Sequence, residues 1–168
     1  MAEKETFTPD PGGTVHVAQY GRLLEDFVPG DVYEHRPGRT ITQADNIHFS
    51  LLTMNRHPAH CDAAYAAETE FGQELVNSTL TMAIITGLTV DDVSAQAIAN
   101  LGWDKVKLTA PVFVGDTLYA RTMVLGVRRS TSRPSQGIVT TATQGYKQDG
   151  TLVLSFERAS LVPAREAP

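Results

Sequence analysis

The sequence predicts an α+β fold in which several antiparallel strands wrap around one buried helix. Two observations predict it. The run from Val76 to Leu88 has helical spacing and is apolar nearly all round, which is typical of a helix buried in a core. The last third of the chain instead consists of strand-like runs separated by turn signals. A sheet wrapped around a single helix would bury both elements, so these patterns favour the α+β class.

Length and the distribution of proline and glycine indicate one domain with an arm and a tail. A chain of 168 residues is the size of a single domain, and such a domain hides roughly 70% of the surface that its unfolded chain exposes. Residues 1–29 are rich in proline, glycine and charge, so we expect an extended arm there. We expect the domain over residues 30–163 and a short tail over residues 164–168.

The first strand and the first helix are expected just before a polar motif. Residues 31–40 can form a strand with a turn near Pro37. Thr42 fits a helix N-cap because Asp45 follows it by three residues, which is the spacing of a capping box. The helix must end near Asn55, because a proline three residues later disfavours helical geometry at the residue before it.

Two more helices and four strands are expected in the rest of the chain. Asp62 can cap a short helix over residues 63–68, and Asn77 or Ser78 is a good N-cap for the buried helix. The Asp149–Gly150 pair is typical of a hairpin turn between two of the strands. The strands are expected over residues 95–106, 117–127, 137–146 and 151–162.

Composition and charge argue against several classes of protein. The net charge of −5 argues against nucleic acid as the main partner, because a phosphate-binding protein usually carries a basic face. No stretch reaches the ~18–20 apolar residues of a membrane span, and the polar N-terminus has no apolar signal region, so we expect a cytoplasmic protein. The single cysteine, Cys61, cannot form an intrachain disulfide, and we expect a small buried filler rather than a nucleophile.

Side chains that can hold and move a proton are concentrated in one short segment. The run from Asn55 to Asp62, followed by Ala64-Tyr65-Ala66, places two histidines, an amide and a carboxylate in a turn fixed by a proline. Active sites are often built in this way, with reactive groups on an irregular segment held between rigid elements. The alternative is an ordinary polar loop whose histidines face water.

Around this motif the sequence resembles the MaoC-like, or (R)-specific enoyl-CoA hydratase, branch of the hot-dog fold. The resemblance covers about residues 30–162, which is most of the chain. The family's signature is an Asp, a His five residues later in an Asn-Pro-x-His turn, then x-Asp-x-x-Tyr-Ala, a Phe-Gly pair and a Val-His-Gly that opens the central helix. A later strand pair of the family is matched by Pro111 to Leu118. The residues that match the signature are Asn55, His57-Pro58-Ala59-His60, Asp62, Tyr65-Ala66, Phe71-Gly72 and Val76-Asn77-Ser78.

Departures from the family pattern resemble one sub-branch. The catalytic Asp of the family is Asn55 here, and the His and Gly at the start of the central helix are Asn77 and Ser78. These changes, with Asn100 to Trp103 and Ser130 to Pro134, resemble a sub-branch that includes mesaconyl-CoA hydratases (β-methylmalyl-CoA dehydratases) and itaconyl-CoA hydratases.

The resemblance implies hydration of an enoyl thioester of coenzyme A, which makes three chemical demands. A water must be held and deprotonated at Cβ, a proton must reach Cα, and the thioester oxygen must be stabilised as enolate charge develops. His60 is the motif residue suited to act as a general base near neutral pH. Asn55 cannot take a proton, so we assign it to orienting the water. The N–H of Ser78 or of Asn77 is the candidate oxyanion donor, at the positive end of a helix dipole.

Arg56 and Arg133 are the candidate cations for substrate binding, and Asn77 is a third candidate contact at the helix start. A dicarboxylic acyl group needs a cation or several N–H donors near its second carboxylate, and Arg56 lies inside the motif. Arg133 could meet the phosphates of coenzyme A. Solvated surface charge is the alternative for both arginines. We expect no metal, because no third ligand stands at a suitable spacing from His57 and His60, and no cofactor apart from the coenzyme A of the substrate.

The predicted function is that of a hydro-lyase that reversibly hydrates a short branched enoyl-CoA. Mesaconyl-CoA, which would give β-methylmalyl-CoA, is the first choice of substrate, and itaconyl-CoA or another short enoyl-CoA is the second. A hydratase-like accessory subunit without catalysis is the alternative from another class, because position 55 lacks the family's carboxylate. A thioesterase is disfavoured, since the run from Ser78 to Gly87 contains no Asp or Glu. The resemblance also implies at least a homodimer, because hot-dog subunits normally pair.

Overall fold

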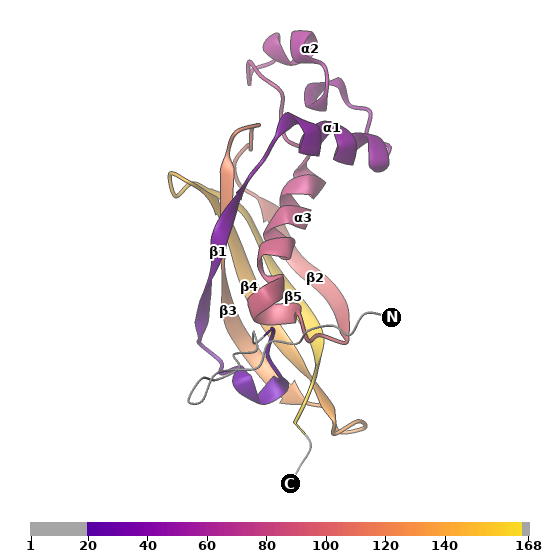
Figure 1. Cartoon of the computed structure of the whole chain (residues 1–168), viewed down its shortest axis with the longest axis vertical. Helices are drawn as coiled ribbons and strands as arrows, with labels where there is room; N and C mark the ends of the chain where they lie inside the picture. The colour runs from indigo at the N-terminus through magenta and orange to yellow at the C-terminus, as the bar shows by residue number, and fades with distance from the viewer. Residues whose placement is uncertain (1–19, 166–168) are drawn as a thin grey trace, which may run out of the picture.

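One sheet and one central helix make up the body of the molecule. The computed structural model describes residues 20–165, in which five antiparallel strands stand in the order β1-β3-β4-β5-β2 and curve around helix α3 (Figure 1). This arrangement confirms the predicted α+β class and the hot-dog fold that the resemblance implied. The strands are β1 Val32–Thr40, β2 Ala99–Leu108, β3 Thr117–Arg129, β4 Gln136–Lys147 and β5 Leu152–Pro163.

Short helices and turns surround the central helix. None of the helices within residues 20–165 is long and apolar enough to cross a membrane. The π-helical turn η3 continues the path of α3 and so delays the next strand. The helical elements are η1 Leu24–Asp26, α1 Gln43–Leu52, η2 Pro58–His60, α2 Ala63–Ala67, α3 Ser78–Leu88 and η3 Val90–Ser94.

Most strand positions agree with the sequence predictions, and the exceptions have local causes. Strands β3, β4 and β5 begin within one residue of their predicted starts. Strand β2 begins at Ala99 rather than at residue 95, because the turn η3 occupies the preceding segment. Strand β1 runs through Pro37 instead of ending before it, and its pairing with β3 shifts register between His35 and Arg39. A bulge at the proline therefore takes the place of the predicted turn.

The predicted capping box starts helix α1. The Thr42 hydroxyl accepts a hydrogen bond from the Asp45 N–H (3.2 Å), and the Asp45 carboxylate accepts one from the Thr42 N–H (2.8 Å). Arg39 lies 2.8 Å from the same carboxylate. The hydrogen bonds from Thr42, and then the charge of Arg39, hold the pKa of the Asp45 carboxyl below its ordinary value. This cap fixes the start of the helix that leads into the polar motif.

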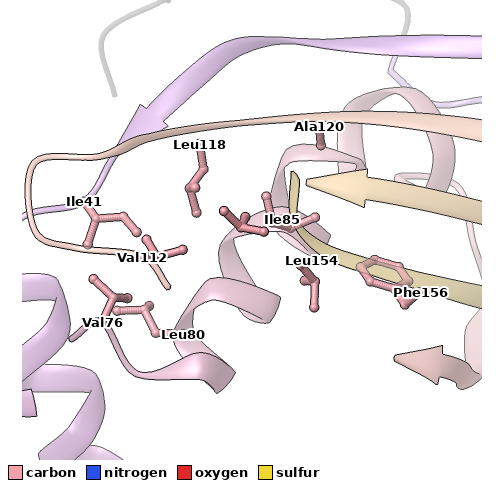
Figure 2. Packing of buried hydrophobic residues seen from close by; sticks show 10 residues of the cluster. Ile41, Val76, Leu80, Ile85, Val112, Leu118, Ala120, Leu154 and Phe156 are labelled. Atoms are coloured by element: carbon pink, nitrogen blue, oxygen red, sulfur yellow. The ribbon is translucent and has the colours of Figure 1, made fainter. Parts of the chain in front are cut away.

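The main apolar core holds α3 against the concave face of the sheet. Ile85 has no exposed surface and lies among core side chains from several strands (Figure 2). Gly145 of β4 allows this close approach, because a Cβ at that position would collide with the Ile85 side chain. The buried core residues are Ile41, Val76, Leu80, Ile85, Val112, Leu118, Ala120, Val153, Leu154 and Phe156.

A second apolar cluster covers the other end of the sheet and corrects the predicted arm boundary. Leu24 and Phe27 are buried in this cluster, which also contains residues of β3, β4 and β5. Residues 20–29 therefore belong to the domain, because two apolar side chains three positions apart cover the sheet end. Ala164 of the predicted tail also packs on this cluster. Residues 1–19 of the predicted arm lie outside the described residues.

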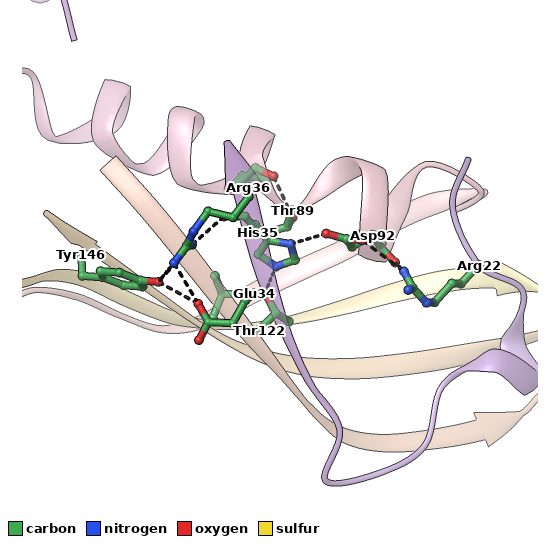
Figure 3. Close-up of polar contacts among 10 residues, drawn as sticks. Arg22, Glu34, His35, Arg36, Thr89, Asp92, Thr122 and Tyr146 are labelled. Atoms are coloured by element: carbon green, nitrogen blue, oxygen red, sulfur yellow. Dashed lines mark hydrogen bonds and ion pairs between the residues drawn. The ribbon is translucent and has the colours of Figure 1, made fainter. Parts of the chain in front are cut away.

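A buried polar layer separates the two apolar clusters. His35 of β1 is buried, and its Nδ1 donates to the Asp92 carboxylate across 2.8 Å (Figure 3). Its Nε2 lies 2.8 Å from the Thr122 hydroxyl of β3. Asp92 also accepts a hydrogen bond from Arg22, at 3.4 Å. These contacts tie the edge strand β1 to the turn η3 that follows the central helix.

Helix α3 is the central helix that the sequence predicted, but part of it and the edge strand β2 stay exposed. Within α3, Ala83 and Gly87 are exposed, and Gly87 lines a groove beside β1. Strand β2 forms one edge of the sheet, so one of its two sides has no strand partner within the described residues. Its exposed apolar side chains are Leu101, Trp103, Val106 and Leu108.

Replacing Asp45 by Asn should destabilise the protein at about pH 7 by about 1 kcal/mol, the usual cost of a weakened helix cap. The folded-state pKa of Asp45 lies below its unfolded value. Its contribution to stability is therefore fully present above the ordinary aspartate pKa and is lost as the pH falls through the folded-state pKa. Urea unfolding of both proteins, followed by tryptophan fluorescence, should show the full difference at about pH 7 and a smaller one as the pH is lowered below the ordinary aspartate pKa. Glu70→Gln, at an exposed carboxylate, is the control, and a difference for Asp45→Asn that does not shrink at low pH would contradict the assignment.

Candidate active site

The polar motif lies at one end of the sheet, where α1 ends, η2 follows and α3 begins (Figure 1). After α1, Met54 takes a left-handed backbone conformation (φ 60°), which turns the chain sharply. The turn η2 then brings His60 beside the segment that enters α3, where the Leu75 N–H donates to the Ala59 carbonyl at 2.9 Å. The irregular segment is thus held between two helices, as the sequence predicted.

A backbone carbonyl fixes the tautomer of His60. The Nδ1 atom of His60 lies 2.9 Å from the Leu75 carbonyl oxygen. Because a carbonyl can only accept, Nδ1 must carry the proton, and Nε2 is the unprotonated nitrogen of the neutral imidazole. No residue within 20–165 forms a hydrogen bond to that Nε2. His60 can therefore take a proton at Nε2, which is the role that the sequence assigned to it.

Asn77 caps helix α3 and is buried. Its Oδ1 accepts hydrogen bonds from the Thr79 N–H (3.0 Å) and hydroxyl (2.7 Å), and its Nδ2 donates to the Ser50 hydroxyl (3.2 Å). Its own N–H donates to Asn46 Oδ1 at 2.8 Å. The N–H that the sequence offered as one possible oxyanion donor is therefore already used. The structure gives Asn77 a role as the cap of α3, and its substrate contact stays a prediction.

Ser78 is the first residue of α3, and its N–H is the candidate donor to the thioester oxygen. The first N–H groups of a helix have no partner inside the helix. No acceptor for the Ser78 N–H is found among the described residues, and its side chain is exposed. The helix dipole adds partial positive charge at this end. Ser78 therefore remains the candidate oxyanion donor, and the choice that the sequence left open falls on it rather than on Asn77.

One pocket of about 340 Å³ is lined by both His60 and Ser78. Its walls are mostly apolar, and no lysine or arginine is among its lining residues. A volume of this order with apolar walls and a few polar groups suits a small ligand group. The other lining residues are Leu75, Val76, Thr81, Leu108, Ala110, Pro111 and Val112.

A slightly larger groove, of about 380 Å³, lies between β1 and the second half of α3, but it contains no motif residue. Two arginines line it, and both are engaged elsewhere. Arg36 donates to the Tyr146 hydroxyl at 3.3 Å, and Arg39 pairs with Asp45 at 2.8 Å. The pocket at the start of α3 is therefore the one that combines a candidate base with an unpaired backbone donor.

Asn55 and Arg56 stand in the same turn but do not line the pocket. The Oδ1 of Asn55 accepts a hydrogen bond from the His57 N–H at 3.2 Å, which leaves its Nδ2 as the group available to a water. Arg56 is exposed and forms no hydrogen bond or ion pair within residues 20–165. His57 has a local role, because its Nδ1 accepts from the Ala59 N–H at 3.2 Å and helps to start η2.

Arg133 does not join these residues within one chain. It lies in the turn between β3 and β4, at the end of the sheet opposite to the start of α3 (Figure 1). Its N–H donates to the Ser130 hydroxyl at 3.1 Å, which belongs to the geometry of that turn. Contact between Arg133 and a ligand of the pocket would therefore require a second copy of the chain.

Two further expectations concern Cys61 and metals. The prediction that Cys61 is buried is wrong: its thiol is free and exposed, because the turn η2 carries it to the outside of the motif. Within residues 20–165, no three His, Cys, Asp or Glu side chains gather into a group that could hold a metal ion. The absence of a metal or a separate cofactor stays a prediction.

Sequence reasoning missed Asn46, which the structure places at the centre of the motif. Asn46 lies in α1, has no exposed surface and bonds to three backbone groups of other segments. The signal that could have found it is a pair of polar residues, Asn46 and Ser50, four positions apart on the inward face of a helix. Buried polar groups on such a face need partners, so they mark a polar contact inside the fold.

Comparisons with known proteins agree with the fold and the motif. Residues 26–146 match the family model described as MaoC like domain. The mesaconyl-CoA hydratase of Haloarcula marismortui is 33% identical over 147 residues, which cover 87% of this chain and 41% of that protein. The (R)-specific enoyl-CoA hydratase of Aeromonas caviae is 29% identical over 115 residues, which cover 68% of this chain and 81% of that protein.

A solved structure has a similar fold. A Mycobacterium tuberculosis protein with a double hot-dog fold superposes with a TM-score of 0.80 at 26% identity, over 88% of this chain and 46% of that one. The chain thus spans about two fifths of the length of the curated mesaconyl-CoA hydratase that it matches (41%) and most of the shorter (R)-specific hydratase (81%). Its described body has the size of one hot-dog unit.

Proposed function

The chain belongs to the MaoC-like domain family, and we propose that it is a hydro-lyase that reversibly adds water to the double bond of a short enoyl-CoA. The observation that carries this proposal is the meeting, on one pocket, of a histidine with an unpartnered Nε2 and a helix-start N–H without an acceptor among the described residues. His60 can move a proton, and the Ser78 N–H can hold charge that develops on a thioester oxygen. Hydration of an enoyl thioester needs both.

The proposed reaction adds one water across the double bond between Cα and Cβ. His60 Nε2 takes a proton from the water as its oxygen forms a bond to Cβ, and the electron pair of the double bond moves through Cα onto the thioester oxygen. The Ser78 N–H and the positive end of α3 stabilise that oxygen. The proton on His60 then passes to Cα, which restores the thioester carbonyl. Asn55 orients the water through its Nδ2, since its Oδ1 is held by the His57 N–H.

For the substrate we propose a short, branched, carboxylated enoyl-CoA, with mesaconyl-CoA as the first choice. The likeness to mesaconyl-CoA hydratase and the small apolar pocket support a short acyl group. No lysine or arginine lines the pocket of one chain, so the cation that pairs with the second carboxylate must come from a residue outside the pocket lining. Arg56, exposed in the motif turn, is the proposed cation. Itaconyl-CoA is the second choice, and a cytoplasmic location stays a prediction from the sequence.

We propose that two copies of the chain pair along strand β2. This edge strand presents apolar side chains to solvent, and Ala83 on α3 is also exposed. Unpaired strand edges offer a row of backbone donors and acceptors to another strand. The likeness to one half of a double hot-dog protein supports the same pairing. A second copy would also supply groups that one chain does not bring to the pocket, including a partner's arginines.

Purified protein should hydrate mesaconyl-CoA faster than crotonyl-CoA, with itaconyl-CoA measured alongside. The assay follows loss of the enoyl-thioester absorbance and a mass gain of one water. His60→Ala should reduce kcat by about 10²–10⁴-fold, the usual contribution of a general base. His48→Ala is the matched control, because His48 is an exposed histidine of α1, and it should retain most of the activity. No turnover of the three thioesters, with coenzyme A binding intact, would contradict the proposal and favour the accessory-subunit alternative.

Ser78→Pro removes the proposed oxyanion donor with little disturbance of the helix. Proline is well accepted at the first position of a helix, and Asn77 already has the extended conformation (φ −55°, ψ 125°) that a residue before proline adopts. We expect kcat to fall by about 10²–10³-fold, as for loss of one oxyanion-hole donor. Ser78→Ala keeps the N–H and should lose far less. Equal activity of the two variants would rule out the backbone donor.

Val106→Asp should convert the proposed dimer to a monomer, because it places a charge on the apolar edge strand. Light scattering after size-exclusion chromatography measures the mass of each form. Met123→Asp is the matched control, since Met123 is similarly exposed (45%, against 44% for Val106) but lies on β3. A dimer that survives Val106→Asp and dissociates with Met123→Asp would move the interface away from β2.

A further inference from the structure

We infer that Asn46 is a positioning residue that sets the tautomer and place of His60 and ties it to the oxyanion end of α3. The inference rests on the proposed hydratase function for its catalytic consequence, but its geometric basis is independent of any substrate. Asn46 touches neither the pocket nor a reacting atom. It acts through the carbonyls of His60 and Leu75 and the N–H of Asn77. These groups belong to the turn that carries His60 and to the segment that starts α3.

The contacts of Asn46 use both ends of its amide. Its Nδ2 donates to the carbonyl oxygens of His60 (2.9 Å) and Leu75 (3.0 Å). Its Oδ1 accepts a hydrogen bond from the Asn77 N–H at 2.8 Å. The partners decide which end is which, because two carbonyls need donors and an N–H needs an acceptor. One side chain from α1 therefore joins the turn η2 to the residue that caps α3.

The Leu75 carbonyl is the link between Asn46 and the proton on His60. The same oxygen accepts from Asn46 Nδ2 at 3.0 Å and from His60 Nδ1 at 2.9 Å. If this carbonyl turned away, Nδ1 would lose its acceptor and either ring nitrogen could carry the proton. Only the tautomer with hydrogen on Nδ1 leaves Nε2 able to act as a base. Asn46 thus supports catalysis through the orientation of one carbonyl.

Burial makes this link strong and specific for asparagine. Asn46 has no exposed surface, so no bulk water can replace a lost contact. An aspartate has the same shape and could still accept from the Asn77 N–H, but its ionised form would face two carbonyl oxygens without a proton to donate. A leucine would leave the His60 carbonyl and the Asn77 N–H without a partner, and the Leu75 carbonyl would keep only its contact with His60 Nδ1. Among side chains of this size, an amide alone supplies both the donors and the acceptor.

The test compares Asn46→Asp with a control that loses buried hydrogen bonds elsewhere. Thr122→Val removes a hydroxyl that bonds His35 and Thr143 and is equally buried, but that lies in the polar layer away from the motif. The first readout is the side-chain ¹⁵N spectrum of His60, assigned with His60→Gln, which reports the tautomer without substrate. The second is kcat and KM for hydration of mesaconyl-CoA. If Asn46→Asp fails to fold, Asn46→Ser, which leaves room for a bridging water, replaces it.

We expect wild-type protein and Thr122→Val to carry the His60 proton on Nδ1, and Asn46→Asp to give a mixture of tautomers. In the same variant kcat should fall by about 10²-fold, the size of effect that a small misplacement of a catalytic group can have, with KM changed by less than about threefold. An unchanged tautomer together with an unchanged kcat in Asn46→Asp would overturn the inference. If wild-type protein hydrates none of the substrates, the proposed function fails while the tautomer comparison still decides the role of Asn46.

Discussion

The packing of Ile85 against Gly145 and the rest of the core holds α3 on the sheet, and the geometry of the site depends on the position of that helix. Ile85 has no exposed surface, and the absence of a side chain at Gly145 leaves room for the Ile85 side chain against β4. Cores are packed densely enough that an added methyl group at Gly145 would push the helix outward. A rigid helix transmits such a shift to both of its ends. The N–H of Ser78, two turns before Ile85, would then move relative to His60, which a different segment carries.

The start of α3 and the turn η2 are joined by neutral amides. Asn77 caps the helix, and Asn46 bonds both to the Asn77 N–H and to the carbonyls beside His60. In a buried environment these hydrogen bonds are strengthened, and an unpaired member would be costly. The network therefore favours one arrangement of base and oxyanion donor. It requires no motion of the backbone to assemble the pair, which is what a preorganised site needs.

Local signals in the sequence predicted local structure, and long-range contacts explain what they missed. The capping box at Thr42, the cap at Asp62 and the cap at Asn77 could be found because each depends on residues within three positions. The role of Asn46 could not, since its partners lie 14 to 31 residues away. The burial of Leu24 depends in the same way on a sheet end built from distant strands. For the site, the sequence proposed His60 as the base and the N–H of Ser78 or Asn77 as the oxyanion donor, and these roles stay predictions. It could not choose between the two N–H groups, because the choice depends on which of them Asn46 already occupies.

The asparagine at position 55 suits the proposed dicarboxylic substrate on electrostatic grounds. A mesaconyl group brings its own carboxylate to a pocket whose walls are mostly apolar. Two like unit charges about 4 Å apart repel each other by about 4 kcal/mol in surroundings of intermediate polarity, so a carboxylate at position 55 would oppose such a group wherever the two came that close. An amide at Asn55 avoids that repulsion and keeps a free donor at Nδ2, which in the proposed mechanism orients the water while His60 moves the proton. An asparagine in place of the family's carboxylate is thus compatible with the proposed catalysis when the substrate itself is an anion. The side chains of Asn46 and Asn77 are also neutral, so they add no negative charge near that anion.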